Sequence, residues 1–318
     1  MTGVAPTPVF PRLAVGCMNF GKRTSPDESV RVVARALERG QTWFDTANVY
    51  NDGDSETILG RALGAERTRC IVATKVGLAR PGGKVEGLRP ERILKAIDES
   101  LERLKMTHVD VYYLHAPDRA TPFAETLDAI AEVLASGKAR AWGMSNYASW
   151  QVLDAMNLAD ARGLARPVVA QLLYNAMVRQ LDVEWFAFAK AHPIHTTIYN
   201  PLAGGLLTEK HLGVDTPAAG SRFDGNTMYQ RRYWSDRMRE HAAALADVAK
   251  EEGLALVDLA YGWVAAQGGV DSVLLGPASV AQLDAGIDGC AKTLSVGARK
   301  KVDDLHRSFQ GTDATYAR

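Results

Sequence analysis

The sequence has few cysteines, and they are not arranged for metal binding. Cys17, Cys70 and Cys290 are the only three among 318 residues, and no two form a Cys-x-x-Cys pair. A His-Glu-x-x-His motif is also missing, so the sequence gives no support for a zinc site. An odd number of widely spaced cysteines is typical of reduced thiols. We therefore expect a cytoplasmic protein without disulfides.

A charge excess, a targeting segment and a membrane-length apolar run are missing as well. Lysine plus arginine number 37, as do aspartate plus glutamate, so the overall charge does not favour nucleic acid or an acidic membrane as a partner. The first ten residues have neither the basic start nor the apolar centre of a signal peptide. No uncharged apolar run is long enough to span a bilayer. These absences leave a small molecule as the expected partner.

Apolar strands and amphipathic helices alternate along almost the whole chain. Eight strands are predicted at residues 12–16, around 44, and at 70–74, 109–114, 139–144, 168–172, 195–199 and 272–275. Apolar strands separated by helices are typical of a parallel sheet that is buried on both faces. Eight units without a low-complexity linker predict one (β/α)8 TIM barrel domain over residues 1–318, with extra helices and long loops at its C-terminal mouth. A doubly wound sheet is the alternative, but its Gly-x-Gly-x-x-Gly turn is missing.

Polar residues follow the predicted strands where each strand ends. The set comprises Asp45, Lys75, His115, Ser145, Asn146, Gln171 and Tyr199. In a (β/α)8 barrel the C-terminal ends of the strands converge on one mouth, where active sites are built. We therefore expect these side chains to lie close together, although each of them alone could be a helix cap, a solvated strand end or an ordinary loop residue.

Three of these residues, together with Tyr50, suit the reduction of a carbonyl group. Tyr50, in the loop after Asp45, is the candidate general acid that protonates the carbonyl oxygen. A phenol has a pKa near 10, and a nearby ammonium such as that of Lys75 would lower it. Asp45 would pair with Lys75 and keep it charged, while His115 would hydrogen-bond the carbonyl and orient it.

Two further segments are suited to a dinucleotide. Tyr199 offers a flat ring for a nicotinamide, Gly204 and Gly205 allow close backbone approach to a pyrophosphate, and Lys210 and Arg222 could neutralise phosphate charge. Ser279 and Gln282 form a capping-box pattern at a helix start that follows the last strand, which is a common anion site in barrels. A mobile surface loop and a plain helix cap are the local alternatives.

Taken together, these residues resemble the aldo-keto reductase superfamily. The match includes Asp45, Tyr50, Lys75 and His115 as a catalytic tetrad, and it extends from about Arg12 to the C-terminus. Within the superfamily the chain is most similar to the aflatoxin aldehyde reductases, through the segments DTANVYNDGDSETILG, SNYASWQV, YNAMVRQLDVE and YNPLAGGLLTEK. The resemblance implies a barrel that uses NADPH to reduce aldehydes and dicarbonyls, including a semialdehyde with a carboxylate. It also implies a homodimer as a frequent assembly.

The resemblance also assigns binding residues. It implies cofactor contacts for Ser145, Asn146, Gln171, Tyr199, Asn200, Pro201, Leu202, Ala203, Gly204, Gly205, Leu206, Thr208, Lys210, Arg222, Gly276, Ala278, Ser279 and Gln282. It implies substrate contacts for His115, Tyr229, Arg232 and the terminal Arg318, and two arginines at the mouth would suit a substrate carboxylate.

Two alternatives and the choice of cofactor stay open at this point. Glu209 replaces the glycine that relatives usually carry, which would put an acid near the phosphates and leaves NADH possible as the cofactor. Potassium-channel β subunits share the barrel and the tetrad and act as regulatory binding modules. A sugar dehydrogenase would run the same chemistry in reverse with NAD or NADP.

Overall fold

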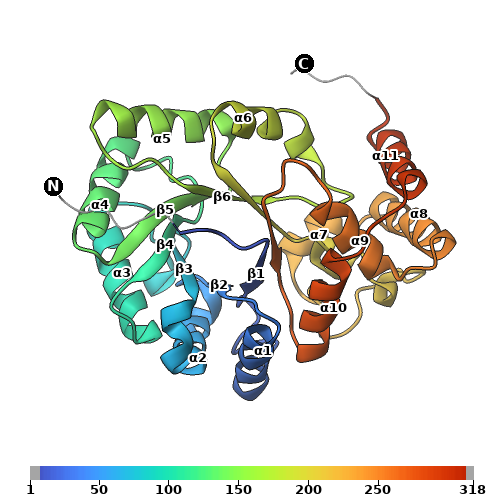
Figure 1. The fold of residues 1–318 in the computed structure, drawn as a ribbon, viewed down its shortest axis with the longest axis horizontal. Helices are drawn as coiled ribbons and strands as arrows, with labels where there is room; N and C mark the ends of the chain where they lie inside the picture. The colour runs from blue at the N-terminus through green and yellow to red at the C-terminus, as the bar shows by residue number, and fades with distance from the viewer. Residues whose placement is uncertain (1–7, 313–318) are drawn as a thin grey trace.

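Eight parallel strands close into one barrel, in the order in which they occur along the chain. The computed structural model describes residues 8–312, and Figure 1 shows the barrel with helices around it. The strands are β1 (Leu13–Gly16), β2 (Trp43–Asp45), β3 (Ile71–Val76), β4 (Val109–Leu114), β5 (Ala139–Ser145), β6 (Val169–Leu173), β7 (His195–Tyr199) and β8 (Ser272–Leu275). This confirms the predicted (β/α)8 barrel.

The alternation of side chains along each strand decides which residues point into the barrel. Trp43, Ala73, Tyr113 and Val169 pack in the small interior cluster, whereas Phe44 and Tyr112 pack in the outer core against the helices. Side chains two residues apart lie on the same face of a strand. The next inward positions toward the mouth are therefore those of Asp45, Lys75, His115 and Gln171.

Eight helices follow the strands and cover the barrel. They are α1 (Pro26–Glu38), α2 (Asp54–Leu63), α3 (Pro90–Leu104), α4 (Phe123–Ala135), α5 (Ser149–Ala161), α6 (Trp185–Ala191), α9 (Leu256–Ala265) and α10 (Val280–Cys290). The helix starts carry local sequence signals: the Ser25 hydroxyl accepts a hydrogen bond from Glu28 N, and Pro90 opens α3. The described helices include none that is both long and apolar enough to cross a membrane.

Three additional helices enlarge one side of the molecule. They are α7 (Thr227–Tyr233) and α8 (Asp236–Glu251) in the β7–β8 connection, and α11 (Val296–Gln310) after α10. Helices α8 and α11 pack side by side at the edge of the barrel (Figure 1). The residue pattern predicts helices near residues 236–252 and 296–309, which correspond to α8 and α11, but it does not predict α7, which has only seven residues and is capped by the Asn226 side chain. The sequence also ended β3 at Thr74, whereas the strand continues to Val76 and includes Lys75.

Candidate active site

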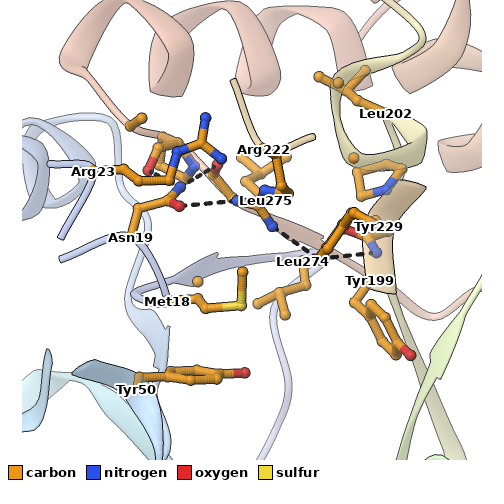
Figure 2. A pocket seen from close by; sticks show the side chains of 18 of the residues that line it. Met18, Asn19, Arg23, Tyr50, Tyr199, Leu202, Arg222, Tyr229, Leu274 and Leu275 are labelled. Atoms are coloured by element: carbon orange, nitrogen blue, oxygen red, sulfur yellow. Dashed lines mark hydrogen bonds between the residues drawn. The ribbon is translucent and has the colours of Figure 1, made fainter. Parts of the chain in front are cut away.

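A cavity of about 850 Å³ opens at the C-terminal mouth of the barrel. It is the place where the predicted site residues meet, and Figure 2 shows part of its lining. The predicted residues that line it are Asp45, Tyr50, His115, Ser145, Asn146, Gln171, Tyr199, Asn200, Pro201, Leu202, Gly204, Gly205, Thr208, Lys210, Arg222, Tyr229, Arg232, Gly276, Ala278 and Gln282. Lys75, Ala203, Leu206 and Ser279 do not line it, and Arg318 lies outside the described residues.

A buried ion pair lies at the base of the cavity. The Lys75 ammonium donates to Asp45 Oδ1 and also to the carbonyl oxygen of Thr46, at 2.8 Å, while the second carboxylate oxygen of Asp45 accepts from Gln171 Nε2, at 2.8 Å. The Lys75 side chain is 0% exposed and that of Asp45 1%. Charges this deep are tolerated only when each is paired and hydrogen-bonded. The predicted pairing of Asp45 with Lys75 is therefore present, and Gln171 completes it.

Tyr50 lies close to this ion pair, and its hydroxyl points into the cavity (Figure 2). The Lys75 Nζ atom is 5.2 Å from the centre of the Tyr50 ring, and the His115 ring meets the Tyr50 ring edge-on at 5.8 Å. Burial, with the Asp45 carboxylate as the second cause, raises the pKa of Tyr50 well above its usual value. The expectation of a lowered Tyr50 pKa is therefore wrong: burial and the Asp45 carboxylate dominate, and the Lys75 ammonium donates its hydrogen bonds to Asp45 and Thr46.

His115 is held as a neutral imidazole. Burial lowers its pKa well below the usual value, and the positive charge of Lys75 lowers it further. Its Nδ1 atom is buried and makes no hydrogen bond within the described part of the chain. A neutral imidazole beside a protonated phenol gives this end of the cavity two polar groups that carry no net charge.

The ends of the neighbouring strands are tied together by the side chains predicted to hold a nicotinamide. The Tyr199 hydroxyl donates to Asn146 Oδ1 at 2.6 Å, and Asn146 Nδ2 donates to the carbonyl oxygen of His115 at 2.8 Å. The Ser145 hydroxyl donates to the carbonyl oxygen of Gln171 at 2.9 Å. These bonds link β5, β6 and β7 to the end of β4 and fix one wall of the cavity.

A cluster of cations lies at the other end of the cavity. Arg222 donates from its Nη2 atom to Asn19 Oδ1 at 2.9 Å and from its Nη1 atom to the Tyr229 hydroxyl at 3.1 Å, as Figure 2 shows. Arg23 lines the same cavity, and burial and the neighbouring Arg222 lower its pKa. In the described chain Arg23, Lys210 and Arg222 form no ion pair with a carboxylate within 4.0 Å. Unpaired cations that face a cavity are suited to an anionic ligand.

Sequence reasoning missed Asn19 and Arg23, although a signal for them was available. Both residues follow β1, and the rule that polar residues at strand ends meet at the mouth applies to the first strand as well. Asn19 Nδ2 donates to the carbonyl oxygens of Gly276 and Pro277, both at 3.1 Å, so it joins the segment after β1 to the segment after β8.

Two expectations about the loops need correction. Glu209 does not line the cavity: its carboxylate accepts a hydrogen bond from Leu256 N, at 2.8 Å, at the start of α9. The acid is therefore directed at a helix N-terminus, where negative charge is favourable. At the start of α10 the Ser279 hydroxyl accepts from Gln282 N as predicted, but Gln282 Oε1 accepts from Ala278 N rather than from Ser279 N.

Comparisons with known proteins agree with this geometry. The Aldo/keto reductase family profile matches residues 12–307. The chain is 38% identical to Aflatoxin B1 aldehyde reductase member 2 of Homo sapiens over 300 residues, which is 87% of this chain and 81% of that protein. It is 33% identical to a probable voltage-gated potassium channel subunit beta of Arabidopsis thaliana over 273 residues, 84% of this chain and 83% of that protein. These matches confirm the resemblance seen in the sequence, and the chain belongs to the Aldo/keto reductase family of oxidoreductases.

Proposed function

We propose that this protein is an NADPH-dependent reductase of aldehydes and dicarbonyl compounds. The observation that carries the proposal is that the Tyr50 phenol faces the cavity, with its ring centre 5.2 Å from the ammonium of the buried Asp45–Lys75 pair. Related proteins named aflatoxin B1 aldehyde reductase support an aldehyde as the substrate.

The cavity has the features that a phosphorylated dinucleotide requires. Arg23, Lys210 and Arg222 line the cavity and have no carboxylate partner among the described residues, and Arg23 and Arg222 lie at the end away from Tyr50 (Figure 2). Gly204 and Gly205 have positive φ angles of 72° and 105° and line the cavity. Glycine adopts such angles without strain and lets a phosphate approach the backbone. The site therefore fits NADPH, which supplies a hydride when bound.

The residues of the chain account for the proton that reduction requires. Tyr50 holds a proton on its hydroxyl and donates it to the carbonyl oxygen of the substrate as negative charge develops there. His115, neutral at the same end of the cavity, is placed to orient that oxygen by a hydrogen bond. The buried pair of Lys75 and Asp45, held by a hydrogen bond from Gln171, places an ammonium near the Tyr50 ring, where it stabilises the phenolate that Tyr50 becomes.

A carboxylated semialdehyde is the substrate class that the cationic mouth favours. Arg232 lines the cavity and lies 5.9 Å from the Tyr229 ring centre, with no carboxylate partner in the described residues. A guanidinium binds a carboxylate in a bidentate manner. Apolar side chains, including those of Val85 and Met228, complete the lining of the mouth.

A carbonyl panel with purified protein tests the proposal. We expect NADPH to be oxidised continuously with aldehydes and dicarbonyls, and we expect a carboxylated semialdehyde to show a lower KM than an uncharged aldehyde of the same length. Absence of turnover with every carbonyl and with both NADPH and NADH would defeat the proposal. Equal KM values for the charged and uncharged aldehydes would contradict the proposed role of Arg232 but not the proposed reductase activity.

The same measurements address the two alternatives. If this protein is a sugar dehydrogenase, it should oxidise sugars with NAD faster than it reduces aldehydes with NADPH. The relative from Arabidopsis thaliana that is named a probable potassium channel subunit beta makes a regulatory module the second candidate. A regulatory module would bind NADPH and turn it over very slowly with any carbonyl.

The arginine pair at the far end of the cavity should control cofactor affinity. Arg23→Gln and Arg222→Gln are each expected to raise the KM for NADPH roughly 10- to 100-fold, because a hydrogen bond to a charged group contributes about 1.5–3 kcal/mol. Initial rates against cofactor concentration measure the effect. Lys22→Gln is the matched control, since Lys22 is exposed and does not line the cavity.

Comparing cofactors then identifies the phosphate involved. A KM for NADPH that rises while the KM for NADH stays constant would assign the arginines to the 2′-phosphate. An equal rise for both cofactors would assign them to the pyrophosphate. An unchanged KM for both cofactors in both variants would show that this cationic end does not bind the dinucleotide.

A further inference from the structure

The connection between β3 and α3 contains a buried carboxylate that the proposed chemistry does not use. This loop, residues 77–89, contributes Leu78, Arg80 and Val85 to the wall of the cavity. Glu86 lies in the same loop, does not line the cavity, and has a side chain that is 0% exposed. A fully buried carboxylate is costly unless it is paired and hydrogen-bonded, so its contacts indicate what it holds in place.

One oxygen of Glu86 gathers three donors from two active-site segments. Its Oε1 atom accepts from Asn48 Nδ2 at 2.9 Å, from Gly77 N at 2.7 Å and from Ala79 N at 3.2 Å. The other oxygen, Oε2, accepts from Arg92 Nε at 2.6 Å. Arg92 lies on α3, so the carboxylate is also fixed to the barrel's outer layer.

The donors belong to the segments that carry the proposed acid and its ammonium partner. Asn48 precedes Tyr50 by two residues, and its backbone N–H donates to the carbonyl oxygen of Lys75 at 3.2 Å. Gly77 follows Lys75 by two residues. The side-chain bond from Asn48 and the backbone bond from Gly77 therefore end on the same oxygen atom, which fixes the two segments relative to each other.

The backbone around Tyr50 gives a reason why such fixation is needed. Asn51 and Asp52, immediately after Tyr50, have φ angles of 52° and 53°, in the left-handed region that Asn and Asp visit as single residues rather than in succession. Such conformations persist only where neighbouring contacts hold them. Asn51 Nδ2 bonds to the segment after β1 on one side, and Asn48 bonds to Glu86 on the other.

We propose that Glu86 is a positioning residue that sets the place of the Tyr50 hydroxyl over the Asp45–Lys75 pair, acting through Asn48. The inference rests on the proposed function of Tyr50 as proton donor. Glu86 does not line the cavity, and among the described residues it forms no hydrogen bond or ion pair with Arg23, Lys210 or Arg222, so we expect its variants to bind the cofactor with unchanged affinity.

Three variants test the proposal in the full-length protein. Glu86→Met removes the acceptor at similar volume, Glu86→Gln keeps an acceptor oxygen, and Glu99→Gln is the control. Glu99 also pairs with Arg92, at 2.5 Å, but makes no contact with Asn48. We expect kcat to fall on the order of 10- to 100-fold in Glu86→Met and less in Glu86→Gln, since small misplacements of reacting groups have effects of this size. The Glu99→Gln variant should keep the kcat of the unmodified protein.

Two readouts separate positioning from a merely structural role. The KM for NADPH should stay constant, and the deuterium isotope effect on hydride transfer should rise in Glu86→Met because the chemical step becomes slower. Amide hydrogen exchange of residues 46–53 should accelerate in Glu86→Met and not in Glu99→Gln. Exchange can be followed without turnover, so it tests whether Glu86 fixes the loop independently of any reductase activity. If the unmodified protein reduces no carbonyl compound, only the proposed function is defeated.

A folded Glu86→Met variant with unchanged kcat, or with unchanged exchange in residues 46–53, excludes a positioning role. If Glu86→Met does not fold, Asn48→Ala decides, because it removes the single bond from the Tyr50 segment and leaves the Gly77 and Ala79 bonds intact. Full activity in Asn48→Ala overturns the proposal, and a fall in kcat at constant KM for NADPH supports it.

Discussion

Replacing Tyr50 with phenylalanine is expected to lower kcat for carbonyl reduction by roughly 10²- to 10⁴-fold, the range that a positioned general acid contributes. The variant loses one hydroxyl, which faces the cavity and makes no hydrogen bond to any residue between 8 and 312, the part of the chain that the structure describes. NADPH should bind with unchanged affinity, because the cations proposed to hold its phosphates lie at the opposite end. Single-turnover rates and cofactor titration measure the two properties separately.

Tyr147→Phe is the matched control for this variant. Tyr147 is close to the mouth but does not line the cavity, and its hydroxyl donates to the carbonyl oxygen of Ala116 at 3.1 Å. Its removal should leave kcat close to that of the unmodified protein. Undiminished turnover in Tyr50→Phe would mean that another group supplies the proton, and the proposed mechanism would be abandoned.

The pH dependence of the same reaction follows from the directions of two pKa shifts. Burial raises the pKa of Tyr50 above its usual 10, so the phenol keeps the proton that it must donate throughout the neutral and alkaline range. Burial lowers the pKa of His115 below its usual 6.5, so the imidazole is neutral in the same range. With respect to these two groups, kcat for reduction should be constant between about pH 6.5 and 10. A decline centred near pH 7 or 8 would instead indicate a phenol acidified by Lys75.

The barrel and the residues at its mouth could be predicted from the sequence, because the signals for them lie within single strands and helices. Side chains two residues apart share a face of a strand, and parallel strands end at one mouth, so Asp45, Lys75, His115 and Gln171 were predictable as neighbours from their positions alone. Helix starts such as those at Ser25 and Pro90 were equally local signals.

What the sequence did not reveal depends on contacts between distant segments. The bond of Glu86 to Asn48 joins residues 38 apart, and the bond of Arg222 to Asn19 joins residues 203 apart. The pKa of Tyr50 also depends on burial, which a motif does not contain: the residue types suggested a lowered value, and the enclosed site gives a raised one. The direction in which Glu209 points, toward α9 rather than the cavity, was likewise set by tertiary packing.

Replacing Lys75 with methionine is expected to lower both stability and activity. The variant leaves the Asp45 carboxylate buried with only Gln171 as a partner. Removing one member of a buried ion pair costs about 3–5 kcal/mol of unfolding free energy, because the remaining charge has no compensation. Denaturant unfolding measures this loss. Lys300→Met is the control: it breaks an exposed pair with Asp304, for which about 0–1 kcal/mol is expected.

The double variant Asp45→Asn with Lys75→Met separates the two effects. Neutral side chains of similar size no longer leave an isolated charge in the core, so much of the lost unfolding free energy should return. Activity should not return, because no ammonium is left to stabilise the phenolate that forms when Tyr50 gives up its proton. Recovery of kcat together with stability would show that the ion pair serves only to hold the barrel mouth together, and that the proton is donated without help from Lys75.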